Sequence, residues 1–316
     1  MERLTVIIPF LNEKDEINNT LESIRNTAGY NVDIILINDA STDGYDYETI
    51  AIKYKVKYIF NKQRKGVAKS RDIGVELLET KYFLIVDGHM RFYNNNWWNI
   101  IIDNLKQEER ALYCCKCKPI DMELKLINSP SWGAYLDLEG KENPSTILSP
   151  HWVRCELNPT QNMVVIPCVL GACYAASKPY WTYLKGLSGL QMYGSDEAYI
   201  SIKVWLEGGN CILIKNVEIG HIFRDRFPYY VDYSFVIFNK LLISETLFPN
   251  KYKYNTYNIV KNTAGICLKT AMELLTAYSK EIMQLRKYYK KISTRTFDSF
   301  VEFNENIKKE NNSFAR

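Results

Sequence analysis

The chain has 316 residues, of which 47% are hydrophobic and 24% are charged, and its net charge at pH 7 is +4. This composition is typical of a globular protein with one large domain or two smaller ones, and it excludes a disordered, collagen-like or coiled-coil chain. The small net charge argues against nucleic acid as a partner. No apolar run reaches the ~18 residues of a membrane span. Strand-like sequence follows Met1 directly, so no signal peptide is expected.

Strand and helix signals alternate over residues 1–120. Runs rich in β-branched residues predict four strands, over residues 4–10, 33–39, 56–60 and 82–87. One helix is predicted after the first strand, with Asn12 as its cap, and another begins at Gly66 after the third strand. This alternation predicts an α/β fold with a mostly parallel, Rossmann-like sheet that is flanked by helices.

The rest of the chain is less regular. Residues 111–185 suggest an antiparallel addition or a segment that covers the substrate. A helix capped by Ser195 is then expected to run to Glu207, before a strand over residues 211–217. Residues 229–316 are predicted to be a helical C-terminal extension, in which one helix carries an apolar stripe of Val260, Ala264, Cys267, Ala271 and Leu274. We therefore divide the chain into residues 1–228, with a nucleotide-binding half (1–120) and an acceptor half (121–228), and residues 229–316.

The eight cysteines lie mostly in apolar runs, which indicates reduced thiols and a cytoplasmic protein. Cys114, Cys115 and Cys117 form a cluster without a CxxC pair. A buried strand explains this cluster better than a zinc site does.

Three side chains that bind metals follow apolar strands. Asp87 and His89 close the fourth strand, and His221 comes after the strand at 211–217. Taken alone, each has a structural explanation: a capped strand end with a solvated histidine, or a histidine satisfied in the core. Together they would make a facial site with oxygen and nitrogen ligands, which suits Mn²⁺ and leaves positions for phosphate oxygens.

Polar residues at the carboxyl ends of the predicted strands are expected to meet in one crevice, because ligands bind there in parallel sheets. Basic residues flank the start of the helix at Gly66, where the positive end of the helix dipole attracts anions. Arg64, Lys65 and Arg71 are the candidates, although a solvated basic turn is the plainer explanation. Asp39 could accept a hydrogen bond from a ribose or a base, or could cap a turn.

Two adjacent carboxylates, Asp196 and Glu197, begin the helix that ends at Glu207. Acidic residues in a first helical turn often only complement the helix dipole. The functional alternative is a carboxylate that orients or deprotonates an acceptor. Consecutive helical residues diverge by ~100°, so we expect Asp196 to act and Glu197 to have a supporting role.

The motifs resemble those of GT-A fold, family 2-type glycosyltransferases, and most of all the catalytic domain of polypeptide N-acetylgalactosaminyltransferases. The resemblance covers residues 4–230. It is carried by the segments 6–13 (VIIPFLNE), 37–41 (INDAS), 64–66 (RKG), 87–89 (DGH), 193–197 (YGSDE) and 220–224 (GHIFR). The first two segments are common to GT-A enzymes, whereas a DxH turn together with a distant GHxFR is much more specific.

The resemblance implies a set of site residues. Asp87, His89 and His221 would bind a divalent metal, Mn²⁺ or alternatively Mg²⁺. Asp196 would lie near acceptor and sugar at the family's glutamate position. The residues expected at the nucleotide-sugar are Pro9, Asn12, Glu13, Asp39, Arg64, Gly66, Arg71, Asp87, Gly88, Gly171, Arg224 and Tyr229. The chain departs from the family at Tyr193 (tryptophan), Ser195 (glycine) and Glu197 (asparagine).

We therefore predict a metal-dependent glycosyltransferase that uses a nucleotide-sugar donor, most simply a UDP-sugar, and an acceptor hydroxyl on a glycan, a lipid-linked glycan or a protein. The alternatives are a sugar-nucleotide-binding pseudoenzyme and a nucleotidylyltransferase. The family's secretory anchor and lectin domain are not recognised in this sequence, which favours a cytoplasmic enzyme. Residues 280–291 are basic and amphipathic, which is typical either of a solvated helix or of a peripheral contact with the inner face of a membrane. Stereochemistry and oligomeric state stay open.

Overall fold

The computed structural model describes residues 2–140 and 143–314. The four predicted N-terminal strands are present, within one or two residues of the expected bounds. They pair in the order β3-β2-β1-β4, and all three pairings are parallel. Their bounds are β1 (Leu4–Phe10), β2 (Val32–Asn38), β3 (Lys57–Phe60) and β4 (Tyr82–Val86). β1 and β4 are buried along their whole length, as expected of central strands covered on both faces.

Helices α1 (Asp15–Ala28) and α3 (Val67–Leu77) were predicted, whereas α2 (Tyr47–Tyr54) and α4 (Trp97–Gln107) were not. The expectation that Asn12 caps α1 was wrong. The cap position is Lys14 and has no side-chain cap, while the Asn12 carboxamide accepts a hydrogen bond from the Thr42 N–H at 2.8 Å. Asn12 has a positive φ of 57°, so it turns the chain at the end of β1 and joins the loop after β2.

The sheet continues beyond β4 with β10-β6-β11-β5, and β9 pairs with β11. β10 is antiparallel to both of its neighbours, and β6 and β11 are parallel to each other. The sheet is therefore mixed but mostly parallel in its N-terminal half, and residues 1–120 and 121–228 share it. The bounds are β5 (Met90–Phe92), β6 (Ala111–Ile120), β9 (Met163–Ile166), β10 (Cys173–Ser177) and β11 (Asn210–Ile222), with a separate hairpin β7 (Ala134–Leu136) and β8 (Pro150–Trp152) joined through the 3-10 turn η1 (Pro144–Thr146).

The cysteine cluster lies in β6, as predicted. Cys114, Cys115 and Cys117 are free and buried. Burial raises the pKa of the Cys114 and Cys117 thiols, which keeps them in the neutral form. They are therefore packing residues of the central sheet.

α5 (Lys178–Tyr183) and α6 (Asp196–Glu207) pack on the second half of the sheet. The predicted end of α6 is confirmed, because Gly208 ends it with a left-handed φ of 103°. The predicted cap was wrong: Ser195 holds the cap position with a φ of 69°, and its side chain makes no capping hydrogen bond. At this helix start the backbone N–H of Glu197 is met by its own carboxylate instead.

The C-terminal part is helical, with α7 (Tyr233–Leu247), α8 (Asn250–Thr263), α9 (Cys267–Ala277), α10 (Ser279–Ile292) and α11 (Phe297–Phe314). The single helix expected across Val260 and Leu274 was wrong, because Gly265 turns the chain with a φ of 53° and separates α8 from α9. In α10 the side chains of Ile282, Leu285 and Tyr289 are buried in the core. Within the described ranges, no helix combines the length and the apolarity that crossing a membrane takes.

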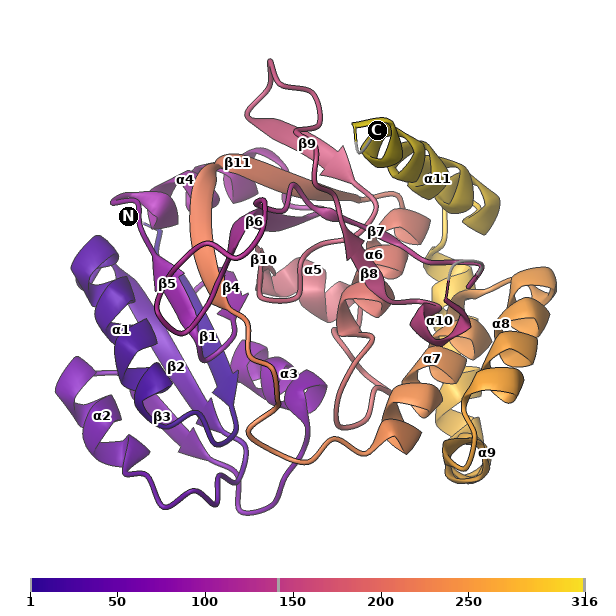
Figure 1. The fold of residues 1–316 in the computed structure, drawn as a ribbon, viewed down its shortest axis with the longest axis horizontal. Coiled ribbons are helices and arrows are strands. Elements are labelled where there is room, and N and C mark those ends of the chain that lie inside the picture. Colours follow the sequence, from indigo (N-terminus) through magenta and orange to yellow (C-terminus); the bar gives the residue numbers. More distant parts are fainter. Residues whose placement is uncertain (1, 141–142, 315–316) are drawn as a thin grey trace.

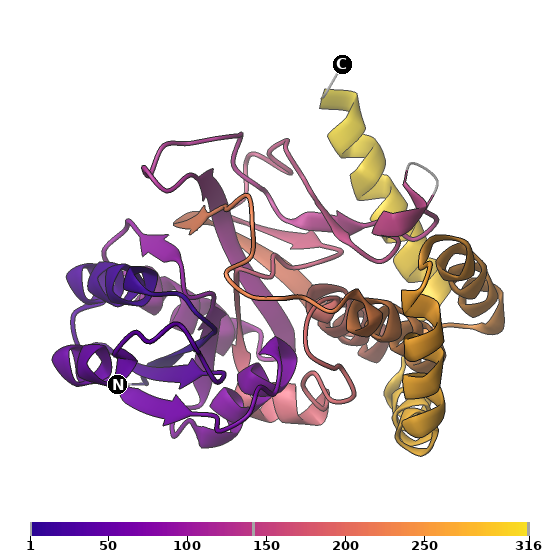
Figure 2. The same ribbon diagram turned by 60° about the horizontal axis from the view of Figure 1, so that its bottom comes forward.

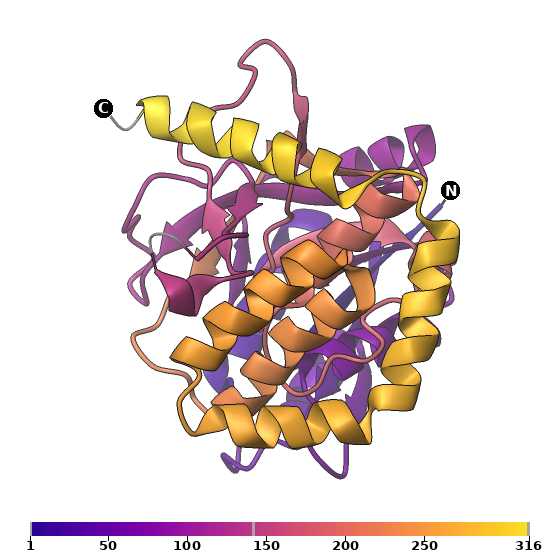
Figure 3. The same cartoon turned by 90° about the vertical axis from the view of Figure 1, so that its right-hand side faces the viewer.

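The layers are visible in two views. α1, α2 and α4 cover one face of the sheet, and α3, α5 and α6 cover the other (Figure 1). The C-terminal helices form a further layer beside α6 (Figures 2 and 3). The predicted α/β architecture with a helical C-terminal extension is confirmed. The carboxyl ends of β1, β2 and β4 are left open to a cavity between the sheet and this layer.

Candidate active site

A cavity of about 530 Å³ opens at the carboxyl ends of β1 and β4. The starts of α3 and α6, the segment after β11 and one side of α7 complete its wall. Most of the residues predicted for the site line it; these are Pro9, Glu13, Asp39, Arg64, Arg71, Asp87, Gly88, His89, Gly171, Asp196, Glu197, His221, Arg224 and Tyr229. Asn12 and Gly66 do not. Asn12 ties two loops together, and Gly66 lies where a Cβ would be 2.3 Å from the Cα of Met192.

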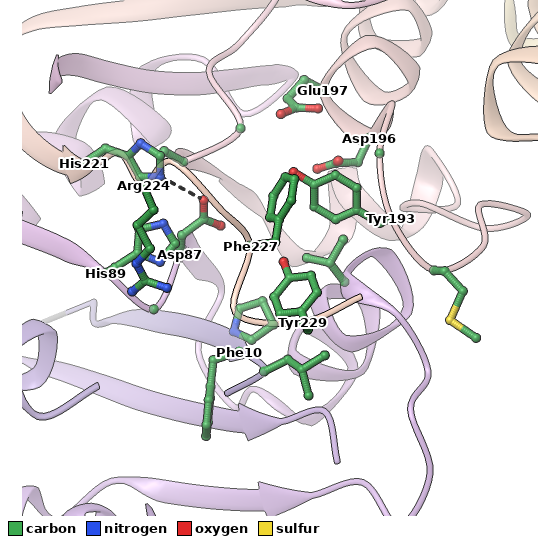
Figure 4. A pocket seen from close by; sticks show the side chains of 18 of the residues that line it. Phe10, Asp87, His89, Tyr193, Asp196, Glu197, His221, Arg224, Phe227 and Tyr229 are labelled. Atoms are coloured by element: carbon green, nitrogen blue, oxygen red, sulfur yellow. Dashed lines mark ion pairs between the residues drawn. The ribbon is translucent and has the colours of Figure 1, made fainter. Parts of the chain in front are cut away.

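The three candidate metal ligands converge on one side of the cavity (Figure 4). Asp87 follows β4, His89 precedes β5, and His221 lies near the end of β11, which runs further than the sequence predicted. One ligand atom from each residue lies within 4.8 Å of the others. The strand pairing explains this, because β5 and β11 are antiparallel and place His221 opposite Met90, next to His89.

The donor set suits a divalent cation. Both ring nitrogens of His221 are buried without a hydrogen-bond partner, and its Nε2 faces the Asp87 carboxylate at 3.5 Å. Burial lowers the pKa of His221 and favours the neutral imidazole that binds metals. Burial disfavours the charged form of Asp87, but the neighbouring His221 and Arg71 outweigh it and hold the pKa of Asp87 well below its usual range. One carboxylate and two imidazoles would hold Mn²⁺ or a similar ion.

Glu13 contacts both a candidate metal ligand, His89, and Arg224. Its Oε2 atom lies 3.2 Å from His89 Nδ1 and accepts a hydrogen bond from Arg224. Burial of Glu13 opposes ionisation, but His89 and Arg224 more than compensate and lower its pKa. Glu13 therefore fixes the ring of a candidate metal ligand and holds Arg224 at the cavity wall.

Arg71 lies at the centre of the site, and its partners were not predicted. It projects inward from α3 and is only 4% exposed. Its guanidinium donates to Asp87 Oδ1 at 3.0 Å, to the Gly171 carbonyl at 3.2 Å and to the Asp196 carboxylate. Although burial opposes its charge, the surrounding acidic groups and Tyr174 raise its pKa. Arg71 thus joins the metal side of the cavity to the start of α6.

Asp39 and Arg64 lie at the turn that begins α3. The Asp39 carboxylate accepts hydrogen bonds from the N–H groups of Lys65 and Gly66, both at 2.8 Å, so it fixes the turn that begins α3. Arg64, on this turn, stacks on the Tyr229 ring at 5.1 Å. The N–H groups of this turn are therefore occupied by Asp39, and the guanidinium of Arg64 is the group at the cavity wall whose positive charge can attract a phosphate.

Aromatic rings fill the space between the metal side and the acidic side. Tyr193 and Phe227 meet edge to face at 5.3 Å, and Phe227 lies 5.7 Å from Tyr229 (Figure 4). Trp152 and Phe223 form another pair, at 5.2 Å. Of these five residues only Tyr229 was predicted for the site, although Tyr193 and Phe223 lie within the motifs at 193–197 and 220–224. An aromatic wall offers flat apolar faces to a base or a sugar ring.

Gly171 and Glu197 are in direct contact. A Cβ at position 171 would lie 1.8 Å from Glu197 Oε1, although the backbone of Gly171 does not have a left-handed φ. We predict that Gly171→Ala destabilises the fold by about 1–3 kcal/mol, because it overpacks this contact. Chemical denaturation of Gly171→Ala, Glu197→Ala and the double variant would measure the effect. If the contact is the cause, most of the cost should vanish in the Glu197→Ala background; an unchanged cost would contradict it.

The chain is similar in sequence to known glycosyltransferases. Residues 5–156 match the family model "Glycosyl transferase family 2". The chain is 26% identical over 237 residues to human polypeptide N-acetylgalactosaminyltransferase 14, an alignment that covers 71% of this chain and 41% of that protein. It is 25% identical over 244 residues to Xenopus tropicalis polypeptide N-acetylgalactosaminyltransferase 11, covering 71% and 39%. The chain thus spans about two fifths of the length of these relatives.

Solved structures agree on the fold. GalNAc-T7, crystallised with UDP, GalNAc and Mn²⁺, aligns with a TM-score of 0.75 and 20% identity over 98% of this chain and 58% of that one. S. aureus TarS in complex with UDP-GlcNAc aligns with a TM-score of 0.52 and 14% identity over 91% and 90%. The fold is the GT-A fold, and the predicted resemblance to the polypeptide N-acetylgalactosaminyltransferases is confirmed.

Proposed function

We propose that this chain, a homologue of GT-A glycosyltransferases, transfers a sugar from a UDP-sugar to an acceptor hydroxyl and requires a divalent metal ion. The observation that carries the proposal is the convergence of Asp87, His89 and His221 in the same cavity as Arg64 and Arg224. A metal site and two arginines at the carboxyl edge of a parallel sheet fit a nucleoside diphosphate. Two relatives of similar fold were crystallised with UDP or UDP-GlcNAc.

The charged residues of the cavity would have two different roles, metal binding and diphosphate binding. Asp87, His89 and His221 would hold the ion, whose charge stabilises the diphosphate that leaves. Arg224 and Arg64 would bind the diphosphate oxygens. On this proposal, Arg224 exchanges its contact with Glu13 for a contact with the nucleotide, because both anions compete for one guanidinium.

Asp196 lies across the cavity from the metal ligands, at the start of α6 (Figure 4). Its carboxylate would orient or deprotonate the acceptor hydroxyl. The acceptor would be a glycan, a lipid-linked glycan or a protein. The eight free cysteines, seven of them buried, support a cytoplasmic protein.

The alternatives have less support. A nucleotidylyltransferase would need a glycine-rich, basic loop directly after β1, where this chain has Asn12 and Glu13. A pseudoenzyme would lack part of the catalytic set. An assay of UDP release from UDP-GalNAc, UDP-GlcNAc and UDP-glucose, with Mn²⁺ and with EDTA, tests the proposal. Release of UDP that depends on Mn²⁺ supports it, and binding without any turnover would favour the pseudoenzyme.

A nucleotide-binding role of Arg64 has a specific consequence. We predict that Arg64→Ala weakens UDP binding about tenfold, which is the loss of about 1.4 kcal/mol from one charged contact. Calorimetry with UDP and Mn²⁺ would measure it. Lys65→Ala is the matched control, because Lys65 carries the same charge on the next residue but does not line the cavity. Equal affinity of the Arg64→Ala variant and the unmodified protein would exclude Arg64 from the nucleotide site.

A further inference from the structure

Glu197 differs from the other buried or partly buried carboxylates that line the cavity. Asp196 and Asp87 are paired with Arg71, and Glu13 is paired with Arg224. Across residues 2–140 and 143–314, by contrast, no other residue donates a hydrogen bond to the Glu197 carboxylate, which is met only by its own backbone N–H. A partly buried carboxylate without a protein partner is unfavourable unless water or a ligand supplies hydrogen-bond donors.

The position of Glu197 directs this carboxylate to the cavity. The side chain lies over Gly171, which has no Cβ to block it, and both residues line the cavity. Glu197 and Asp196 lie on the same side of the cavity, opposite the metal ligands (Figure 4). Burial and the nearby Asp87 raise the pKa of Glu197, whereas Arg71 acts in the opposite direction.

A count of charges explains why Arg71 does not neutralise Glu197. The Arg71 guanidinium already donates to two carboxylates, those of Asp87 and Asp196. Glu197 is therefore a third acidic group beside one cation. Even if a divalent ion binds Asp87, Glu197 remains an acceptor with no donor of its own. Its complement is a group that carries O–H or N–H donors and no negative charge, such as the hydroxyl groups of a neutral sugar.

We infer that Glu197 is a specificity residue for the donor sugar: its carboxylate accepts hydrogen bonds from a neutral hexose and disfavours a uronic acid in the same pocket. The inference rests on the proposed function, because it assumes that the sugar of a UDP-sugar enters this side of the cavity. Two neighbouring hydroxyl groups of a hexose match the two oxygens of one carboxylate. A sugar carboxylate would instead face a like charge in a partly desolvated pocket, which weakens binding.

The test uses two pairs of sugar nucleotides, and the two members of each pair differ only at C6. Affinities for UDP, UDP-glucose, UDP-glucuronate, UDP-galactose and UDP-galacturonate are measured by calorimetry with Mn²⁺, for the unmodified protein and for Glu197→Gln. The amide keeps the size of the side chain and removes its charge. UDP is the internal control for folding, since it lacks the sugar.

We expect the unmodified protein to prefer at least one hexose over its uronate by about tenfold or more, because hydrogen bonds to a charged group are strong. Glu197→Gln should reduce this preference at least threefold and leave the affinity for UDP within twofold. Equal binding of hexoses and uronates by the unmodified protein would overturn the inference, even if the variant fails to fold. An unchanged preference in Glu197→Gln would also overturn it, while the proposed function would stand. If the unmodified protein binds neither UDP nor any UDP-sugar, both fail.

Discussion

Replacing His221 with alanine should reduce Mn²⁺-dependent turnover by on the order of 10²–10³-fold or more, because one of three ligands is lost where negative charge develops. Both ring nitrogens of His221 are buried without a hydrogen-bond partner. Removing the ring therefore costs its packing against His89 and Phe223 at the cavity wall, but no hydrogen bond. The fold should therefore stay intact. The affinity for Mn²⁺ should fall by at least 10–100-fold.

The measurements are UDP release at saturating UDP-sugar and calorimetric titration with Mn²⁺. His151→Ala is the matched control. His151 is another of the chain's three histidines, but it stacks on Tyr135 in the β7–β8 hairpin and does not line the cavity. If Mn²⁺-dependent turnover of His221→Ala equals that of His151→Ala, the assignment of the metal site is refuted.

Asp196→Asn should reduce sugar transfer by on the order of 10²-fold or more if Asp196 orients or deprotonates the acceptor. The variant keeps the shape of the side chain and should keep the affinity for UDP. It also removes the charge of one partner in the buried ion pair with Arg71. The free energy of unfolding should therefore fall by about 3 kcal/mol, which is at the lower end of the cost of breaking a buried ion pair. If Asp196 only complemented the helix dipole, the cost would be at most about 1 kcal/mol, with little effect on rate.

Slow hydrolysis of the UDP-sugar by water serves as the assay until an acceptor is known, and chemical denaturation gives the stability. Glu48→Gln is the control for the helix dipole, since Glu48 is an exposed acidic residue in the first turn of α2. It should change neither quantity appreciably. Near-full transfer activity in Asp196→Asn would remove Asp196 from the mechanism, and unchanged stability would mean that its contact with Arg71 contributes little.

The pair Asp196 and Glu197 illustrates the limit of sequence analysis. Sequence placed both at the start of a helix and favoured Asp196 by resemblance. The tertiary structure pairs Asp196 with Arg71 and leaves Glu197 over Gly171 without a partner. The helix start follows from local signals. The distribution of partners depends on Arg71, which is 125 residues away in the chain.

The sequence by itself determined the strands of the parallel half and the ends of β4 and α6, because buried strands and glycine-terminated helices have strong local patterns. It also determined which residue types reach the carboxyl edge, and 14 of the predicted site residues line one cavity. The sequence did not predict α2 or α4, because their helix signals are short. It also did not predict the break at Gly265, because the apolar stripe continues across this turn.

Only the tertiary structure decided which charges neutralise one another. His221 reaches Asp87 because β11 runs on beyond the predicted strand and pairs with β5. Arg71 reaches Asp196 because the segments that lead into α3 and α6 pair at Gly66 and Met192. Ionic contacts depend on distances between atoms, which pairing and packing set across more than 100 residues of chain. Local sequence specifies the ends of elements, but the electrostatic balance of the site exists only once the sheet and the helices have assembled.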